Sequence, residues 1–169
     1  MTSLLSRLAV GGVLIAALGG AVAPVAVAAP APAAVNCNDG NVLKQVLVSA
    51  DHDGVGVAFN FACKVSSIVD IAPLNPGEKP YNIAGEGEFP KLDKTAKSWV
   101  RVMVSGIDWT NPSAPNLGTY IKGEGAVKQI VNGGTFEGQT LWFIGLDKKR
   151  PFVKNVSGKT VTVTVKAGA

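Results

Sequence analysis

The chain has 169 residues, 16 of them basic and 12 acidic, and a formal net charge of +4. This length predicts one domain, and the scarcity of like-charge blocks argues against a nucleic-acid-binding surface. One histidine and two cysteines are too few for a site of several zinc ligands, so zinc hydrolases are close to excluded. We expect neither a metal nor a cofactor.

Residues 1–28 have the pattern of a secretory signal peptide. A short N-terminus with one basic residue, Arg7, precedes an uncharged run at 8–22 and the small-residue motif Ala-Val-Ala at 26–28. The run is rich in Gly and Ala and is interrupted by Pro24, which makes it a poor span of a ~30 Å hydrocarbon core. We expect cleavage near residue 28. The exported chain then has 15 basic and 12 acidic residues, a net charge of +3 and no membrane span.

A short tether and a domain follow the signal peptide. Residues 29–35 (APAPAAV) are a Pro/Ala tether, and residues 36–169 form the predicted domain. Cys37 and Cys63 are the two cysteines, and in an exported chain they predict one disulfide. Their spacing is far from C-x-x-C, which favours a structural bond worth roughly 3 kcal/mol over a redox pair.

Apolar residues recur with a period of two in several segments. Alternation at 55–63, 100–105 and 160–165 predicts half-buried strands and places Cys63 on an inward face. The continuous apolar run 141–146 predicts a strand covered on both faces. No segment keeps a helical period for three turns.

Turn signals separate these runs. Asp53-Gly54 predicts a hairpin, and further turns are expected at 75–77, 132–134 and 157–158. Strands at this spacing predict an all-β fold, a β-sandwich of antiparallel strands in a single domain.

No catalytic set is evident. His52, the only histidine, lies between Asp51 and Asp53 in a turn, where an exposed histidine is the expected reading. Alternate carboxylates can bind calcium, but no Glu follows at the EF-hand distance. Glu86 and Glu88 form a conceivable glycosidase pair, although the glycines around them more simply indicate a bulge or turn. We expect no enzyme activity.

Two surface features are candidates for ligand binding. Lys148, Lys149 and Arg150 form a basic loop that can meet phosphate polymers or an anionic membrane, although such a run is more often a solvated hairpin. Trp109 precedes a Pro-rich loop and is expected to be the most exposed tryptophan, whereas Trp142 lies in an apolar run and is expected in the core.

The C-terminal part has a recognisable order of motifs. Phe-Glu-Gly at 136–138, Ile-Gly-Leu-Asp at 144–147 and Arg-Pro-Phe at 150–152 precede a closing Val-rich strand. In this it resembles the AMIN-like domain, a family of exported actinobacterial proteins. Residues 56–61 look like the first Val-rich strand of that family. The usual Gly-Tyr-x-Val block is replaced by Cys-Lys-Val at 63–65, and the cysteine pair looks like a local addition.

The resemblance implies a β-sandwich in the cell envelope, and through the related AMIN domain it suggests binding of peptidoglycan or another wall polymer. It carries over no catalytic residue and is an analogy at the level of the fold. We therefore expect an extracytoplasmic, non-catalytic module that is a monomer and whose partner is a wall polymer or an envelope protein. The alternative is a protein-protein interaction module that adds a partner strand to an open sheet edge.

Overall fold

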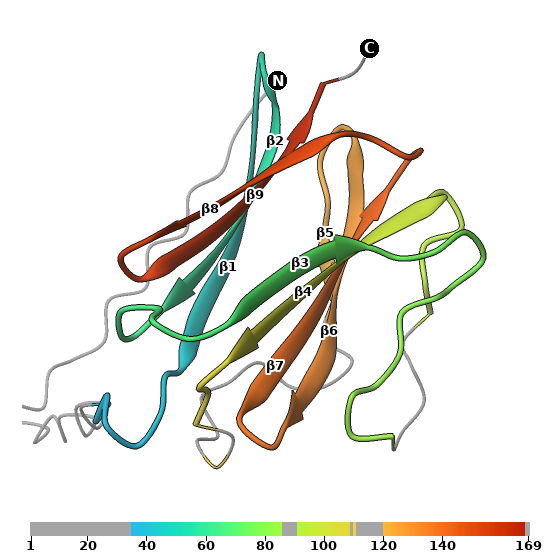
Figure 1. The fold of residues 1–169 in the computed structure, drawn as a ribbon. Helices are drawn as coiled ribbons and strands as arrows, with labels where there is room; N and C mark the ends of the chain where they lie inside the picture. Colours follow the sequence, from blue (N-terminus) through green and yellow to red (C-terminus); the bar gives the residue numbers. More distant parts are fainter. Residues whose placement is uncertain (1–34, 86–90, 109, 111–119, 168–169) are drawn as a thin grey trace, which may run out of the picture. The chain divides into compact units, whose positions relative to one another are not determined.

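The computed structural model describes residues 35–85, 91–108, 110 and 120–167. The expected signal peptide, and all of the tether except Val35, lie outside these residues. The described residues hold no helix that is long and apolar enough to cross a membrane. Their strands form two antiparallel sheets, which confirms the predicted all-β sandwich (Figure 1).

Four strands form one sheet and five form the other. In spatial order, the first sheet contains β1 (Leu43–Asp51), β2 (Gly54–Phe61), β9 (Thr160–Lys166) and β8 (Phe152–Ser157). The second contains β3 (Val69–Pro73), β4 (Ser98–Ser105), β7 (Gln139–Leu146), β6 (Val127–Phe136) and β5 (Tyr120–Lys122). All strand pairs within both sheets are antiparallel.

The main core lies between the two sheets. Every second residue of β2 and β9 is buried in it, as the alternation of the sequence predicts. Trp142 of the other sheet is 1% exposed, and its ring meets that of Phe59 edge-on at a centroid distance of 5.8 Å. The prediction that Trp142 is a core residue is therefore confirmed.

The predicted disulfide between Cys37 and Cys63 is present, with the two Cα atoms 5.8 Å apart. Cys63 is buried, although β2 ends two residues before it. The buried Asn41 side chain links the start of the domain to the segment that carries Cys63. Its Oδ1 accepts hydrogen bonds from the backbone N–H groups of Val42 and Cys63, and its Nδ2 donates to the Cys63 carbonyl.

The turn predicted at residues 132–134 is wrong, because these residues lie inside β6. The pairing of β6 with β7 shifts register between Asn132 and Gly134, and Gly134 has a φ of +98°. The Asn132 side chain accepts a hydrogen bond from the Gly134 N–H at 2.8 Å. Glycine at a positive φ is common to glycine-containing bulges and to several tight turns, so Asn-Gly-Gly suits both structures.

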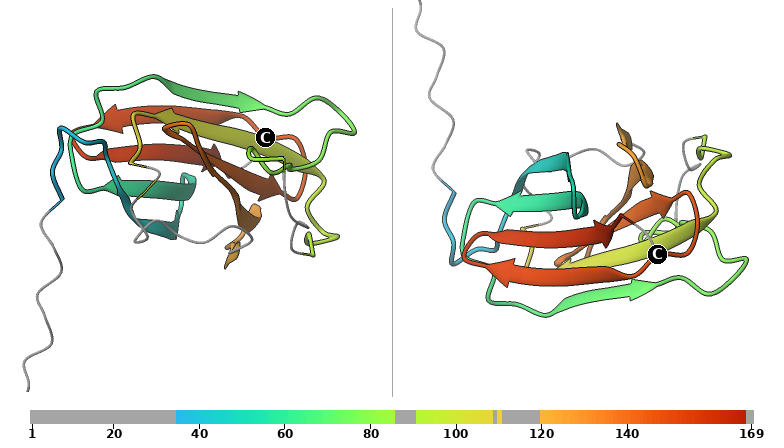
Figure 2. Two further views of the ribbon diagram at one scale, coloured as in Figure 1. Left: turned by 90° about the horizontal axis from the view of Figure 1, so that it is seen from below. Right: turned by 90° about the horizontal axis from the view of Figure 1, so that it is seen from above.

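The outer face of the five-stranded sheet carries a second, smaller core. Its buried members are Trp99, Val131, Leu141 and Phe143. The connection between β3 and β4, residues 74–97 without 86–90, packs on them through Leu74, Ile83, Leu92 and Ala96. Figure 1 shows this connection, coloured green to yellow, to the right of the strands. In both views of Figure 2 it lies on the far side from the blue N-terminal residues.

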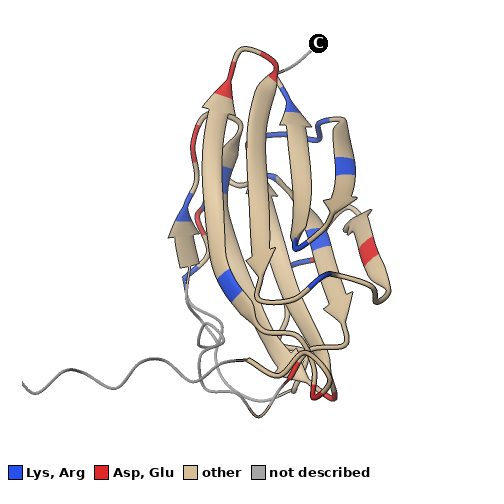
Figure 3. Ribbon diagram, turned by 90° about the vertical axis from the view of Figure 1, so that its left-hand side faces the viewer, with Lys and Arg blue, Asp and Glu red and all other residues tan. Residues whose placement is uncertain are grey.

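No segment of the described part of the chain covers the outer face of the four-stranded sheet. The register of this sheet places one row of outward side chains on each strand. Away from the strand ends, these side chains are all small or uncharged. Figure 3 views this sheet and shows β2 and β9 free of charged residues except near their ends. The row that we call the bare face consists of Gln45, Leu47, Ser49, Gly56, Ala58, Asn60, Val153, Asn155, Ser157, Thr160, Thr162 and Thr164.

Candidate functional site

The candidate site is an open hollow of about 500 Å³ on the outer side of the five-stranded sheet. Two elements line it: the edge formed by β5 and β6, and the part of the connection that crosses above them. We call it the lysine groove, because four of its lining residues are lysines. The residues that line it are Lys91, Leu92, Asp93, Lys94, Tyr120, Lys122, Lys128 and Gln129.

The register of β5 and β6 determines which side chains reach the groove. Ile121 pairs with Ile130, and these two side chains pack toward the core between the sheets. Tyr120 and Lys122 therefore point to the opposite, outer side, where Lys122 pairs with Gln129. Tyr120 is 60% exposed, which leaves its ring free to contact a ligand.

Gln129 attaches the connection to the sheet. The side chain is 4% exposed, and its Oε1 accepts a hydrogen bond from the Asp93 backbone N–H at 2.8 Å. Its Nε2 donates a longer hydrogen bond to the Lys91 carbonyl, at 3.4 Å. One buried amide thus holds both ends of the segment that carries Lys91 and Asp93, which positions the lysine wall of the groove.

Asp93, the one carboxylate among the described residues that line the groove, is engaged by its own turn. Its Oδ1 accepts hydrogen bonds from the backbone N–H and the hydroxyl of Thr95, at 2.7 and 2.6 Å. These bonds lower the pKa of Asp93, and the positive charges of Lys128 and Lys97 lower it further. Asp93 is therefore a charged turn residue, and its position in the groove follows from the fold of the loop.

The lysines of the groove keep their positive charge available. Within the described residues none of the four lies within salt-bridge distance of a carboxylate. Lys128 donates instead to a neutral acceptor, the Gly125 carbonyl, at 2.7 Å. The groove combines these charges with the apolar side chain of Leu92 in its lining, an arrangement suited to an anionic ligand with some apolar surface.

The structure divides the predicted basic loop into two parts. Arg150 forms a two-bonded salt bridge with Asp147, at 2.7 and 2.8 Å, and donates a further hydrogen bond to the Ala167 carbonyl. The Arg150 guanidinium lowers the pKa of Asp147 to about 2. Lys148 and Lys149 are exposed. The loop thus offers two lysines to a ligand, while Arg150 has a structural partner.

Three residues considered from the sequence fall outside the described part of the chain. Trp109, the predicted exposed tryptophan, is one of them, and Glu86 and Glu88 are the others. Their proposed roles in binding or catalysis therefore stay predictions.

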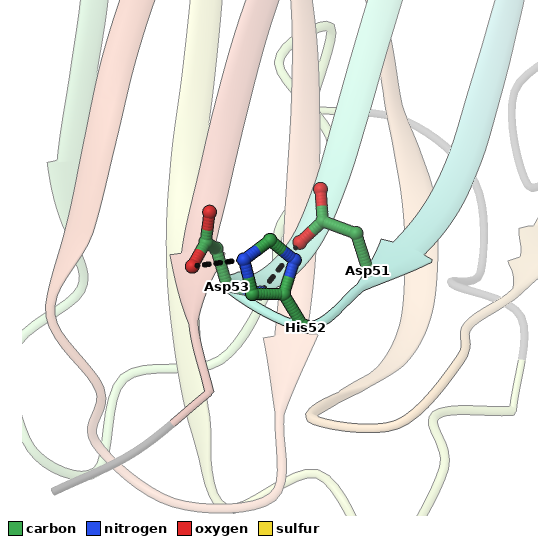
Figure 4. A group of neighbouring side chains, drawn as sticks. All are labelled: Asp51, His52 and Asp53. Atoms are coloured by element: carbon green, nitrogen blue, oxygen red, sulfur yellow. Dashed lines mark hydrogen bonds and ion pairs between the residues drawn. The ribbon is translucent and has the colours of Figure 1, made fainter.

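The hairpin tip between β1 and β2 brings Asp51, His52 and Asp53 together (Figure 4). One Asp51 oxygen accepts hydrogen bonds from the backbone N–H groups of Asp53 and Gly54, and His52 Nε2 lies 3.2 Å from Asp53 Oδ1. The His52 side chain is 89% exposed, as expected for a turn histidine. The turn itself explains why these groups are close, so we assign no site here.

The groove lysines were not identified from the sequence, because they come from separate segments. Lys122 and Lys128 flank one turn, whereas Lys91 and Lys94 lie on the connection, and the hydrogen bonds of Gln129 to Asp93 and Lys91 hold the two sets together. The usable signal was local: residues 91–97 (KLDKTAK) contain three lysines in seven residues.

We compared the chain with protein-family models, with curated proteins and with solved structures, and none of the three comparisons finds a match. The arrangement of the chain's own residues is therefore the basis for inferring what it does.

Proposed function

We propose that this protein is an exported, non-catalytic module that binds an anionic polymer of the cell envelope through the lysine groove. The single observation that carries the proposal is that four lysines converge on an open hollow, also lined by Leu92, and that none of them forms a salt bridge with a carboxylate of the described residues. Wall polymers with phosphate or carboxylate groups supply the complementary charge. An open groove also suits a chain that continues beyond the site at both ends.

Several features of the sequence support the cellular location. Residues 1–28 have the order of segments found in signal peptides, and the disulfide between Cys37 and Cys63 is typical of oxidising compartments. The resemblance to the AMIN-like family supports the same location, and its most specific motifs fall on residues 136–152, from the end of β6 to the start of β8.

The proposal is tested by sedimentation of the mature chain with purified wall sacculi that retain their anionic polymers. The test variant replaces the four groove lysines with glutamine. The matched control replaces four lysines of the other sheet and its hairpin, so that both variants lose the same charge. These control positions are Lys44, Lys154, Lys159 and Lys166.

We expect the groove variant to bind at least tenfold more weakly than the control. Exposed ion pairs contribute roughly 0.2–1 kcal/mol each, so four together give about 2 kcal/mol, and each 1.4 kcal/mol changes affinity about tenfold. Raising the salt concentration should weaken sacculus binding by the unmodified chain more than sacculus binding by the groove variant. Equal binding by the two variants would refute the assignment of the groove.

The alternative is an interaction module that accepts a strand from a protein partner. β8 favours it, because it lies at an edge of its sheet and all of its residues except Phe152 are exposed. If the unmodified chain and its variants all fail to bind sacculi, this alternative is favoured.

A further inference from the structure

The lysine groove is one of three neighbouring hollows. A second hollow, of about 260 Å³, shares Leu92, Asp93 and Lys94 with the groove. A third, of about 290 Å³, shares Trp99 with the second. Because neighbouring hollows share lining residues, they lie in a row along the connection, from the edge at β5 to Pro73 at the end of β3, and we call this row the depression.

Lysines line each of the three hollows of this depression. Lys79 lines the second hollow, and Lys97 and Lys149 line the third. With the four of the groove, seven lysines line the three hollows, a set that we call the lysine track. Lys149, one of the residues predicted from the sequence, thereby joins a surface that the sequence did not reveal.

Among the described residues, two carboxylates line the track, and both have partners within their own turns. Asp93 is held by Thr95, as described above, and Glu78 accepts hydrogen bonds from the backbone N–H and the side-chain amide of Asn75, both at 2.9 Å. Seven lysines against these two carboxylates give the described lining of the depression a formal charge of +5. A ligand that follows the track therefore needs negative charge at intervals along its length.

The two ends of the track lie at opposite edges of the five-stranded sheet. β5 and β3 are the edge strands, so the track crosses four strand spacings. At about 4.8 Å for each spacing, this distance is about 19 Å. We propose that the lysine track binds one extended polyanion that lies across all five strands, so that its ligand is a polymer chain and not a single anionic group.

This inference rests on the proposed function, because the groove is the first segment of the track, and it adds the form of the ligand. Charges on one polymer chain reach successive lysines at a high effective concentration once the first contact has formed. Affinity should therefore rise steeply with chain length until the ligand spans about 19 Å, and only slowly beyond that length.

The experiment uses inorganic polyphosphate of graded length, beginning with tripolyphosphate, and measures its affinity for the mature chain at constant ionic strength. One variant changes the near end of the track (Lys122→Gln with Lys128→Gln), and another changes the far end (Lys97→Gln with Lys149→Gln). A control with the same change in charge, Lys44→Gln with Lys154→Gln, lies on the other sheet. Circular dichroism establishes that each variant is folded.

We expect chains that span the track to bind at least tenfold more tightly than tripolyphosphate. The near-end and far-end variants should each weaken the spanning chains about fivefold relative to the control. If only the near-end variant weakens them, the groove binds alone, so the proposed function stands and the track is refuted. If neither variant differs from the control, both the track and the groove are refuted.

Discussion

The two outer faces of the sandwich are both built from antiparallel strands but differ in the side chains that they present. On the five-stranded sheet, outward residues such as Trp99, Leu141 and Phe143 are large and apolar, and the connection 74–97 covers them. On the four-stranded sheet, outward residues such as Ala58 and Thr162 are small or polar and need no cover. The lysines of the proposed site belong to the covered face, because the covering segment supplies many of them.

The comparison teaches how a binding surface can arise on a sandwich. An apolar outer face must be removed from water, and here a long connection accomplishes this. The connection lies on the outer surface of the sheet, and the hollows along the borders of the connection form the candidate site. None of the described segments covers the bare face, whose strands β2 and β9 are free of charged residues except near their ends (Figure 3).

The largest expected difference between the faces is in stability. Phe143→Ala removes a fully buried ring from beneath the connection and should lower the free energy of unfolding by about 3–5 kcal/mol. Val153→Ala, on the bare face, should change it by about 0.5 kcal/mol or less. Urea denaturation measures both. Similar losses for the two variants would contradict the view that only one outer face carries a core.

Removal of the disulfide should destabilise the chain without affecting the lysine-bearing face. The double variant Cys37→Ser with Cys63→Ser opens a loop closed over a separation of 26 residues, which costs roughly 3 kcal/mol. Thermal unfolding should show this loss, while the folded variant should keep its affinity for polyphosphate. Weaker binding by the folded variant would link the groove to the end of the molecule that holds the disulfide.

Gln129→Leu should loosen the connection without any change of charge. It removes the hydrogen bonds to Asp93 and Lys91 and leaves their backbone groups without those partners, at a cost of about 1–3 kcal/mol. We expect polyphosphate affinity to fall as well, because the lysine wall loses its anchor.

The matched control is Thr160→Val, which removes the hydrogen bond between Thr160 and Asn60 on the half-exposed bare face. It should cost about 0.5–1.5 kcal/mol at most and leave polyphosphate affinity unchanged. Equal losses of affinity in the two variants would argue against a positioning role for Gln129.

The smallest effect is the pH dependence that comes from Asp147. Arg150 lowers the pKa of this carboxyl from 3.8 to about 2 in the folded chain, so folding favours its charged form. The stabilisation is complete above about pH 4 and is lost as the pH falls through about 2. The unfolding free energy of Asp147→Asn should therefore fall less between pH 4 and pH 2 than that of the unmodified chain. An identical fall would contradict the assignment.

The sequence predicted the difference between the faces better than it predicted the site. The unbroken apolar run of β7 indicated a strand covered on both sides, and the Val/Thr alternation of β9 indicated one covered on a single side, and both are confirmed. The residues Asn-Gly-Gly at 132–134 predict a turn but form a bulge, because glycine at a positive φ is common to tight turns and to glycine-containing bulges. The groove depends on the hydrogen bonds of Gln129 to Asp93 and Lys91, residues 36 and 38 positions away along the chain, which no local pattern encodes.

The central claim is that the polyanion binds the outer face of the five-stranded sheet. Amide chemical shifts recorded by NMR during titration with spanning polyphosphate test it most directly. We predict shifts concentrated at Lys91, Lys122, Gln129 and Lys149, with little change at Thr162 on the bare face. Shifts concentrated on β2, β8 and β9 would contradict the account.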